Sequence, residues 1–78
     1  MKYELWDLTS RNVAGFFETE ADALDAVRAA GHTHGAAYAE CFALIREDAR
    51  GRSKTIARGT ELVKRALAAA RDRNRISA

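Results

Sequence analysis

Two histidines and one cysteine in the segment GHTHGAAYAEC, residues 31–41, are the side chains best suited to metal or nucleophilic chemistry. Structural zinc sites usually use four ligands, often in CxxC or HxxxH pairs. A catalytic Cys–His pair needs an activated, partly exposed thiolate. His32 and His34 lie one residue apart, no second cysteine is present, and Cys41 is expected in an apolar strand that faces a core. A loop at a helix end is therefore favoured over a metal or catalytic site, and we expect no cofactor.

A larger set of candidate residues is basic. Residues 1–40 contain three basic and seven acidic side chains, whereas residues 41–78 contain ten basic and four acidic ones. This asymmetry can mark an anionic partner, or two faces of one domain that attract each other or pair head to tail. The candidate contact residues are nine of these ten, namely Arg50, Arg52, Lys54, Arg58, Lys64, Arg65, Arg71, Arg73 and Arg75.

If the last helix packs on the sheet, these basic side chains could form one face for phosphate contacts. The glycines match no phosphate-binding loop. Phe42 is the one aromatic residue in this half, so contact with a duplex is favoured over readout of single strands. A solubilising surface remains the alternative.

The first half of the chain predicts a hairpin followed by a helix. Residues 2–8 and 13–18 have the composition of two strands, joined around residues 9–12. Thr19 is the expected N-cap of the helix, with acidic residues in the first turn. Gly31 is a plausible end of that helix, and Gly35 is the rival, which would place both histidines in the last turn.

The second half predicts the same order again. Residues 40–48 form an apolar strand whose two faces both need cover, which suggests a central strand or a dimer contact. Residues 53–58 form a polar strand, where Lys54 and Arg58 would protect a sheet edge. Thr60 is expected to cap a second amphipathic helix. Residues 70–78 are expected to be a frayed basic tail.

The first strand also offers a candidate interface. Tyr3 and Leu5 share one of its faces, and Trp6 and Leu8 share the other. A single tryptophan in such a strand is usually a core residue. If one face of the sheet is uncovered, however, Tyr3 and Trp6 could anchor a partner, because both residue types are enriched in binding hot spots.

The chain length of 78 residues predicts one small domain with a limited core. Dimerisation is a common way for such a domain to bury more surface. No apolar run approaches the roughly 18 residues of a membrane span, and the single cysteine cannot form an internal disulfide. We therefore expect a cytoplasmic protein that does not enter a membrane.

Three stretches carry a resemblance: YELWD near the start, GFFETEADALDAVR after it, and HG..Y at 34–38. From about Tyr3 to Leu67 the chain resembles a group of small uncharacterised bacterial proteins from high-GC organisms. The resemblance implies a compact cytoplasmic domain of helices and strands and brings no known activity. The segment KRALAAARDR is superficially similar to the last helix of double-stranded-RNA-binding domains, but their αβββα order differs from the order expected here.

Together these patterns predict a single α+β domain over residues 1–78. Its order is ββαββα, with a mainly antiparallel four-stranded sheet and both helices on one face. The first functional hypothesis is a non-enzymatic interaction or regulatory module, a homodimer or a binder of another protein. The alternative is nucleic-acid binding through the basic second hairpin and last helix. A small enzyme or metal site at His32, His34 or Cys41 is the third.

Overall fold

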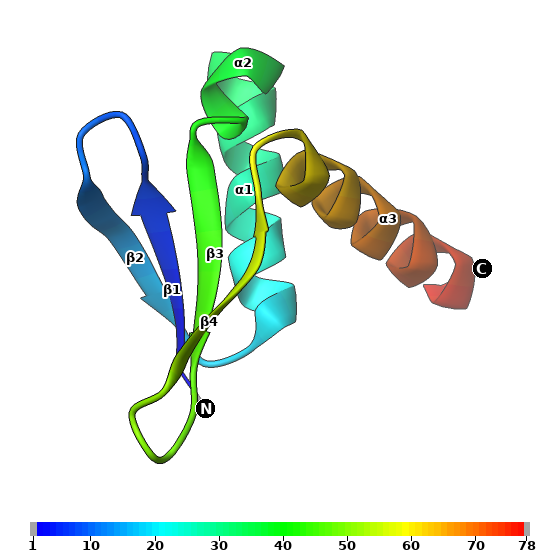
Figure 1. Cartoon of the computed structure of the whole chain (residues 1–78). Helices are drawn as coiled ribbons and strands as arrows, with labels where there is room; N and C mark the ends of the chain where they lie inside the picture. Colours follow the sequence, from blue (N-terminus) through cyan, green and yellow to red (C-terminus); the bar gives the residue numbers. More distant parts are fainter. Residues whose placement is uncertain (1, 78) are drawn as a thin grey trace.

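The computed structural model describes the backbone of residues 2–77 and the side chains of residues 2–71. It confirms the α+β class and the ββαββα order, and it adds a single-turn helix before the third strand (Figure 1). The elements in chain order are β1 (Lys2–Asp7), β2 (Asn12–Phe17), α1 (Glu20–His34), α2 (Ala36–Ala39), β3 (Phe42–Glu47), β4 (Ser53–Arg58) and α3 (Thr60–Ser77).

The four strands form one antiparallel sheet with the order β2-β1-β3-β4. The apolar strand β3 is therefore internal, and the polar strand β4 is an edge, as the sequence predicts. Leu5 of β1 lies opposite Leu44 of β3, and Leu44 lies opposite Ala57 of β4. The register shifts once between β1 and β2 and once between β3 and β4, so each edge strand carries an extra residue at a bulge.

Both long helices cover the same face of the sheet. Helix α1 contacts β1 and β2, α3 contacts β3 and β4, and the two helices contact each other (Figure 1). The core between these layers consists of Leu5, Ala23, Leu24, Val27, Ala39, Phe42, Leu44, Leu62 and Ala66. Strand residues that point to this face are called helix-side below, and the opposite face is called the open face.

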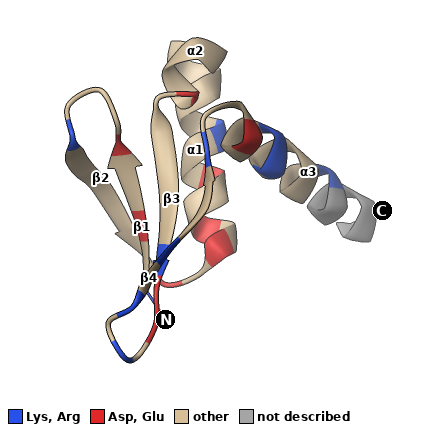
Figure 2. Ribbon diagram, in the orientation of Figure 1, with Lys and Arg blue, Asp and Glu red and all other residues tan. Residues whose placement is uncertain are grey.

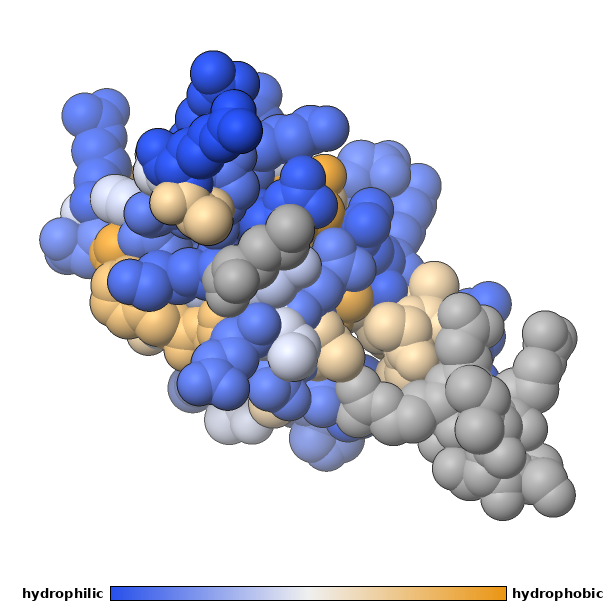
Figure 3. All heavy atoms as spheres, turned by 90° about the horizontal axis from the view of Figure 1, so that it is seen from below, coloured by the Kyte–Doolittle hydropathy of each residue, from blue (hydrophilic) through white to orange (hydrophobic). Residues whose placement is uncertain are grey.

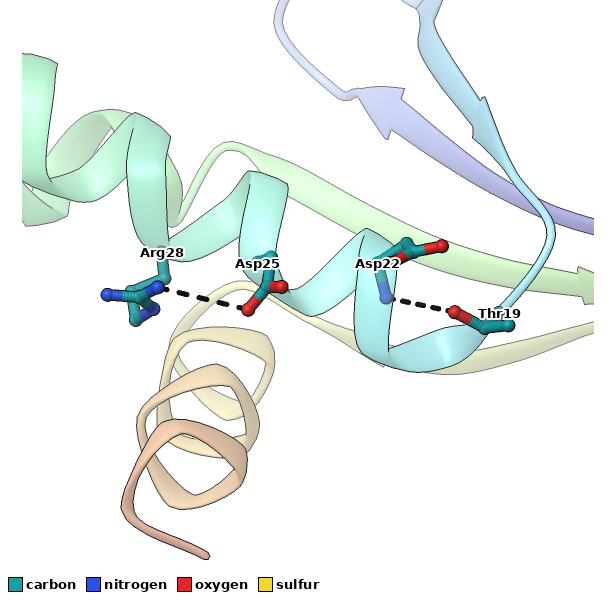
Figure 4. Close-up of polar contacts among 4 residues, drawn as sticks. All are labelled: Thr19, Asp22, Asp25 and Arg28. Atoms are coloured by element: carbon teal, nitrogen blue, oxygen red, sulfur yellow. Dashed lines mark hydrogen bonds and ion pairs between the residues drawn. The ribbon is translucent and has the colours of Figure 1, made fainter. Parts of the chain in front are cut away.

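Helix α1 begins where the sequence predicts. The Thr19 hydroxyl accepts a hydrogen bond from the Asp22 amide at 3.1 Å, which satisfies one of the amides left free at a helix start (Figure 4). Arg28 lies 3.9 Å from Asp25 one turn away on the same helix. The helix ends at Gly35, whose φ of 96° and ψ of 158° suit glycine, and the Gly35 amide donates to the Gly31 carbonyl at 2.8 Å.

Of the two helix ends that the sequence left open, Gly35 is the one found: Gly31 lies within α1, so His32 and His34 occupy its last turn. Two other sequence-based placements are wrong in detail. Cys41 precedes β3 rather than forming part of it, and its side chain is half-buried rather than in the core. Thr60 is the first residue of α3 rather than its cap, because the Gly59 carbonyl accepts the amides of Leu62 and Val63.

Helix α3 continues to Ser77 and so includes most of the segment expected to be a tail. The side chains of that segment after Arg71, including those of Arg73 and Arg75, lie outside the described residues. Within residues 2–77, no helix is both long enough and apolar enough to cross a membrane.

Candidate interaction surfaces

The open face of the sheet carries an apolar centre. Cross-strand pairing places Trp6 between Val13 of β2 and Ala43 of β3, and it places Glu4 between Phe16 and Ile45. Directly paired residues share one face of a sheet. The apolar set of the open face is therefore Trp6, Val13, Phe16, Ala43 and Ile45. No described helix covers it, but the exposure of its members differs: Phe16 is 60% exposed, Trp6, Val13 and Ile45 are half-buried, and Ala43 is buried.

Trp6 is only partly covered on this face, yet its indole Nε1 is buried and has no hydrogen-bond partner among the described residues. Buried indole N–H groups usually find an acceptor. An unpaired buried donor costs roughly 1–3 kcal/mol. Trp6 therefore occupies the open face at a cost to the free energy of folding of the isolated domain.

Tyr3, the other residue expected at an interface, does not share this surface. It lies opposite Phe17 and Arg46 on the helix side, where it packs against the core cluster. The alternation of the first strand predicts this separation, so Trp6 is the interface candidate that remains on the open face.

Charged residues border the apolar set. Lys2 lies opposite Glu47 at one end of the open face, with its Nζ 5.5 Å from the centre of the Phe16 ring. Arg58 lies opposite Ala43 at the other end. Seen from below, the surface is mostly hydrophilic, with one group of apolar side chains at the left edge, the side on which β2 lies, and another toward the right, the side on which α3 lies (Figure 3).

A second surface follows the β4 edge and is basic. Arg58, Lys64 and Arg65 line a hollow between β4 and α3, together with Glu61. Arg46, Lys54 and Arg65 line a neighbouring hollow, together with Glu20. We call the five cationic residues Arg46, Lys54, Arg58, Lys64 and Arg65 the basic edge.

The structure brings together four of the seven described basic residues proposed from the sequence. Lys54, Arg58, Lys64 and Arg65 belong to the basic edge. Arg50 and Arg52 lie instead in the β3–β4 turn, where their amides donate to the Asp48 carboxylate at 2.8 and 2.9 Å. Arg71 lies further along α3 and lines neither hollow.

Sequence reasoning missed Arg46 and Glu20 as members of this surface. Arg46 follows the apolar run of β3, and Glu20 comes from the acidic first half. The signal for Arg46 is the alternation of β3, which places it on the same face as Leu44. Glu20 could not be found in this way, because only the packing of α1 beside α3 brings it there.

Ion pairs moderate the positive charge of the basic edge. The Arg65 guanidinium lies 3.3 Å from the Glu20 carboxylate and links α3 to α1, while Lys64 lies 3.8 Å from Glu61 within α3. Figure 2 shows acidic residues at the start of α1 and basic residues along β4, its turn and the first half of α3. The two oppositely charged halves of the sequence therefore meet partly within one domain.

The histidines and the cysteine do not converge. His32 and His34 are both exposed, and the His34 ring contacts Tyr38 with a centroid distance of 4.8 Å. The Cys41 thiol donates to the Ala37 carbonyl at 3.5 Å. Among the described residues, no group of three or more His, Cys, Asp or Glu side chains is placed to hold a metal ion.

An apolar groove of about 370 Å³ lies between α1, α2 and α3. The small side chains of its lining residues, among them Gly31, Ala36 and Ala39, leave the space that forms the groove. His32 also lines it. Leu67 of α3 also lines it and is 49% exposed.

Comparison with protein-family models, curated proteins and solved structures finds no match to this chain. The resemblance to small high-GC bacterial proteins therefore stays a prediction.

Proposed function

We propose that the chain is a non-enzymatic interaction or regulatory module that forms a homodimer through the open face of its sheet. The observation that carries this proposal is the apolar set of five residues on a face that no described helix covers. Phe16 lies within this set and is the most exposed of the large apolar residues described. A domain of 78 residues gains stability when such a surface is buried.

A second copy of the chain is the partner that fits this face best. A twofold dimer needs a surface that is complementary to itself. The open face meets this need, because Lys2 and Arg58 provide positive charge at its border and Glu47 provides negative charge there, while Glu4 lies within the apolar set between Phe16 and Ile45. Each copy can thus offer an apolar centre to the other and place charges of opposite sign around it.

Substitution of Phe16 tests the proposal. The wild-type chain should be a dimer by light scattering, and it should remain one in about 1 M NaCl. At this salt concentration the Debye length is about 3 Å, so charge pairs are weakened while the burial of apolar surface is not. Phe16→Lys should give a folded monomer. Its ammonium would face Glu4 across the strand pair, so the change is tolerated in the isolated domain but not in an apolar interface.

Leu67→Lys is the matched control, since Leu67 is similarly exposed but lies on α3, away from the sheet. This variant should remain a dimer. A wild-type monomer would refute the proposal. A dimer that dissociates with Leu67→Lys and persists with Phe16→Lys would move the interface to the helices.

Nucleic-acid binding through the basic edge is the second candidate function. Its support is the presence of five cationic residues along two adjoining hollows that contain only two carboxylates, Glu20 and Glu61. Duplex affinity, measured by fluorescence anisotropy from about 50 to 200 mM salt, should fall with a log–log slope near −0.9 per phosphate contact. Undetectable binding at the lowest salt would exclude this function.

A further inference from the structure

We infer that the hollow between the start of α1, strand β4 and helix α3 is a binding site for a phosphate group. The hollow has a volume of about 230 Å³ and is lined by Glu20, Arg46, Lys54, Thr55, Ile56 and Arg65. It lies on the helix side of the sheet. The inference is therefore independent of dimerisation through the open face.

The first observation is a pair of like charges on neighbouring strands. Arg46 of β3 lies directly opposite Lys54 of β4, on the same side of the sheet as Leu44. Like charges at directly opposed positions destabilise a sheet. Within residues 2–71, neither side chain has an ion-pair partner. An anion placed between them would relieve this repulsion.

The second observation is the convergence of a third cation on the same hollow from another element. Arg65 reaches it from α3 and lies 3.3 Å from the carboxylate of Glu20, which orients the guanidinium. Three cationic residues and one carboxylate give this lining a net charge of +2. Two guanidinium groups offer paired N–H donors, and Lys54 adds a point charge.

The charge and volume of the hollow suit a phosphate monoester. Such a group carries about −1.5 to −2 near pH 7, which balances the charge of the lining. A water molecule takes up about 30 Å³ in the liquid, so the hollow has room for the five atoms of a phosphate group and part of its hydration shell. The phosphodiester of a nucleic acid offers the same oxygen acceptors with a single charge.

Titration of the full chain with inorganic phosphate, adenosine monophosphate and a short DNA duplex, followed by amide NMR spectra, tests the site. Saturable shifts are expected at Arg46, Lys54 and Arg65. The double substitution Arg46→Gln with Lys54→Gln should weaken binding at least tenfold. The matched control, Arg50→Gln with Arg52→Gln, removes the same charge from the β3–β4 turn and should change affinity less than threefold.

The three ligands separate the sources of the phosphate group. Saturation by phosphate or the nucleotide, lost in the Arg46/Lys54 variant, identifies a small phosphate compound. Saturation by the duplex alone, with the same loss, identifies a nucleic-acid backbone, and both results support the site. Lys54→Gln alone should also weaken binding, and because Lys54 is exposed, this variant retains the fold. Equal losses in the two double variants, or no saturation in the wild type, would overturn the inference.

Discussion

At the scale of single residues, Gly31 and Gly35 have opposite requirements although they lie one helical turn apart. Gly35 has φ 96° and ψ 158°, a conformation that is almost restricted to glycine. A Cβ atom at Gly35 would meet nothing within 4 Å, so backbone strain alone opposes a side chain there. Gly31 is helical, and a Cβ atom there would lie 3.4 Å from the Ala39 Cβ, at ordinary contact distance.

Alanine substitutions should therefore change stability in opposite directions. We expect Gly35→Ala to lower the free energy of unfolding by about 1–3 kcal/mol. Gly31→Ala should raise it by up to about 1 kcal/mol, because alanine favours helix over glycine. Urea unfolding followed by circular dichroism, at one protein concentration, measures both. A loss of stability in Gly31→Ala larger than that in Gly35→Ala would show that the packing of α1 against α2 has been misjudged.

The two glycines also show what a sequence can and cannot tell about a single position. Both were plausible helix ends, since each follows a run of helix-forming residues. The choice depends on the contact of α2 with α1, which the local sequence does not encode. By contrast, the separation of Tyr3 from Trp6 follows from alternation along one strand, and the structure has it as predicted.

At the scale of elements, strands and caps with a local signal were predicted best. The apolar run of β3 indicated an internal strand, and Lys54 with Arg58 indicated an edge at β4. Thr19 marked the start of α1 through its short polar side chain. Helix α2 was missed because its four residues, AAYA, lie between two stronger signals and are too few to show a helical period.

The candidate surfaces were only partly predictable because they depend on register. The sequence placed Lys54 and Arg58 on one strand, four residues apart, where regular alternation would give them the same face. The shift between β3 and β4 places Lys54 opposite Arg46 on the helix side, whereas Arg58 lies opposite Ala43 at the end of β4 and lines the other hollow with Lys64 and Arg65. A bulge of one residue thus determines which cationic side chains lie next to each other, and the sequence of residues 53–58 gives no signal that predicts the bulge.

At the scale of the whole molecule, folding brings part of the acidic first half of the chain next to part of the basic second half. The acidic start of α1 is brought beside the basic β4 and α3, and Glu20 is the one carboxylate among Arg46, Lys54 and Arg65. Removal of Glu20 would leave three cations facing one another across three elements. The packing of the two halves should therefore depend on this side chain more than an exposed ion pair usually allows.

Glu20→Gln should lower the free energy of unfolding by about 1 kcal/mol at low salt, through loss of the Arg65 pair and of a favourable charge in the first turn of α1. Glu61→Gln is the matched control, because Glu61 is also a first-turn acid with a cationic partner, Lys64. Glu61→Gln should lower the free energy of unfolding by only a few tenths of a kcal/mol, because the Glu61 side chain is 76% exposed and fewer unpaired cations surround it than surround Glu20.

In about 1 M NaCl the difference in unfolding free energy between the two variants should shrink, because salt screens the charges. Adding Lys54→Gln to Glu20→Gln should restore part of the lost stability. Urea unfolding at both salt concentrations would contradict this account if the two single variants were equally stable at low salt, or if salt left the gap between them unchanged.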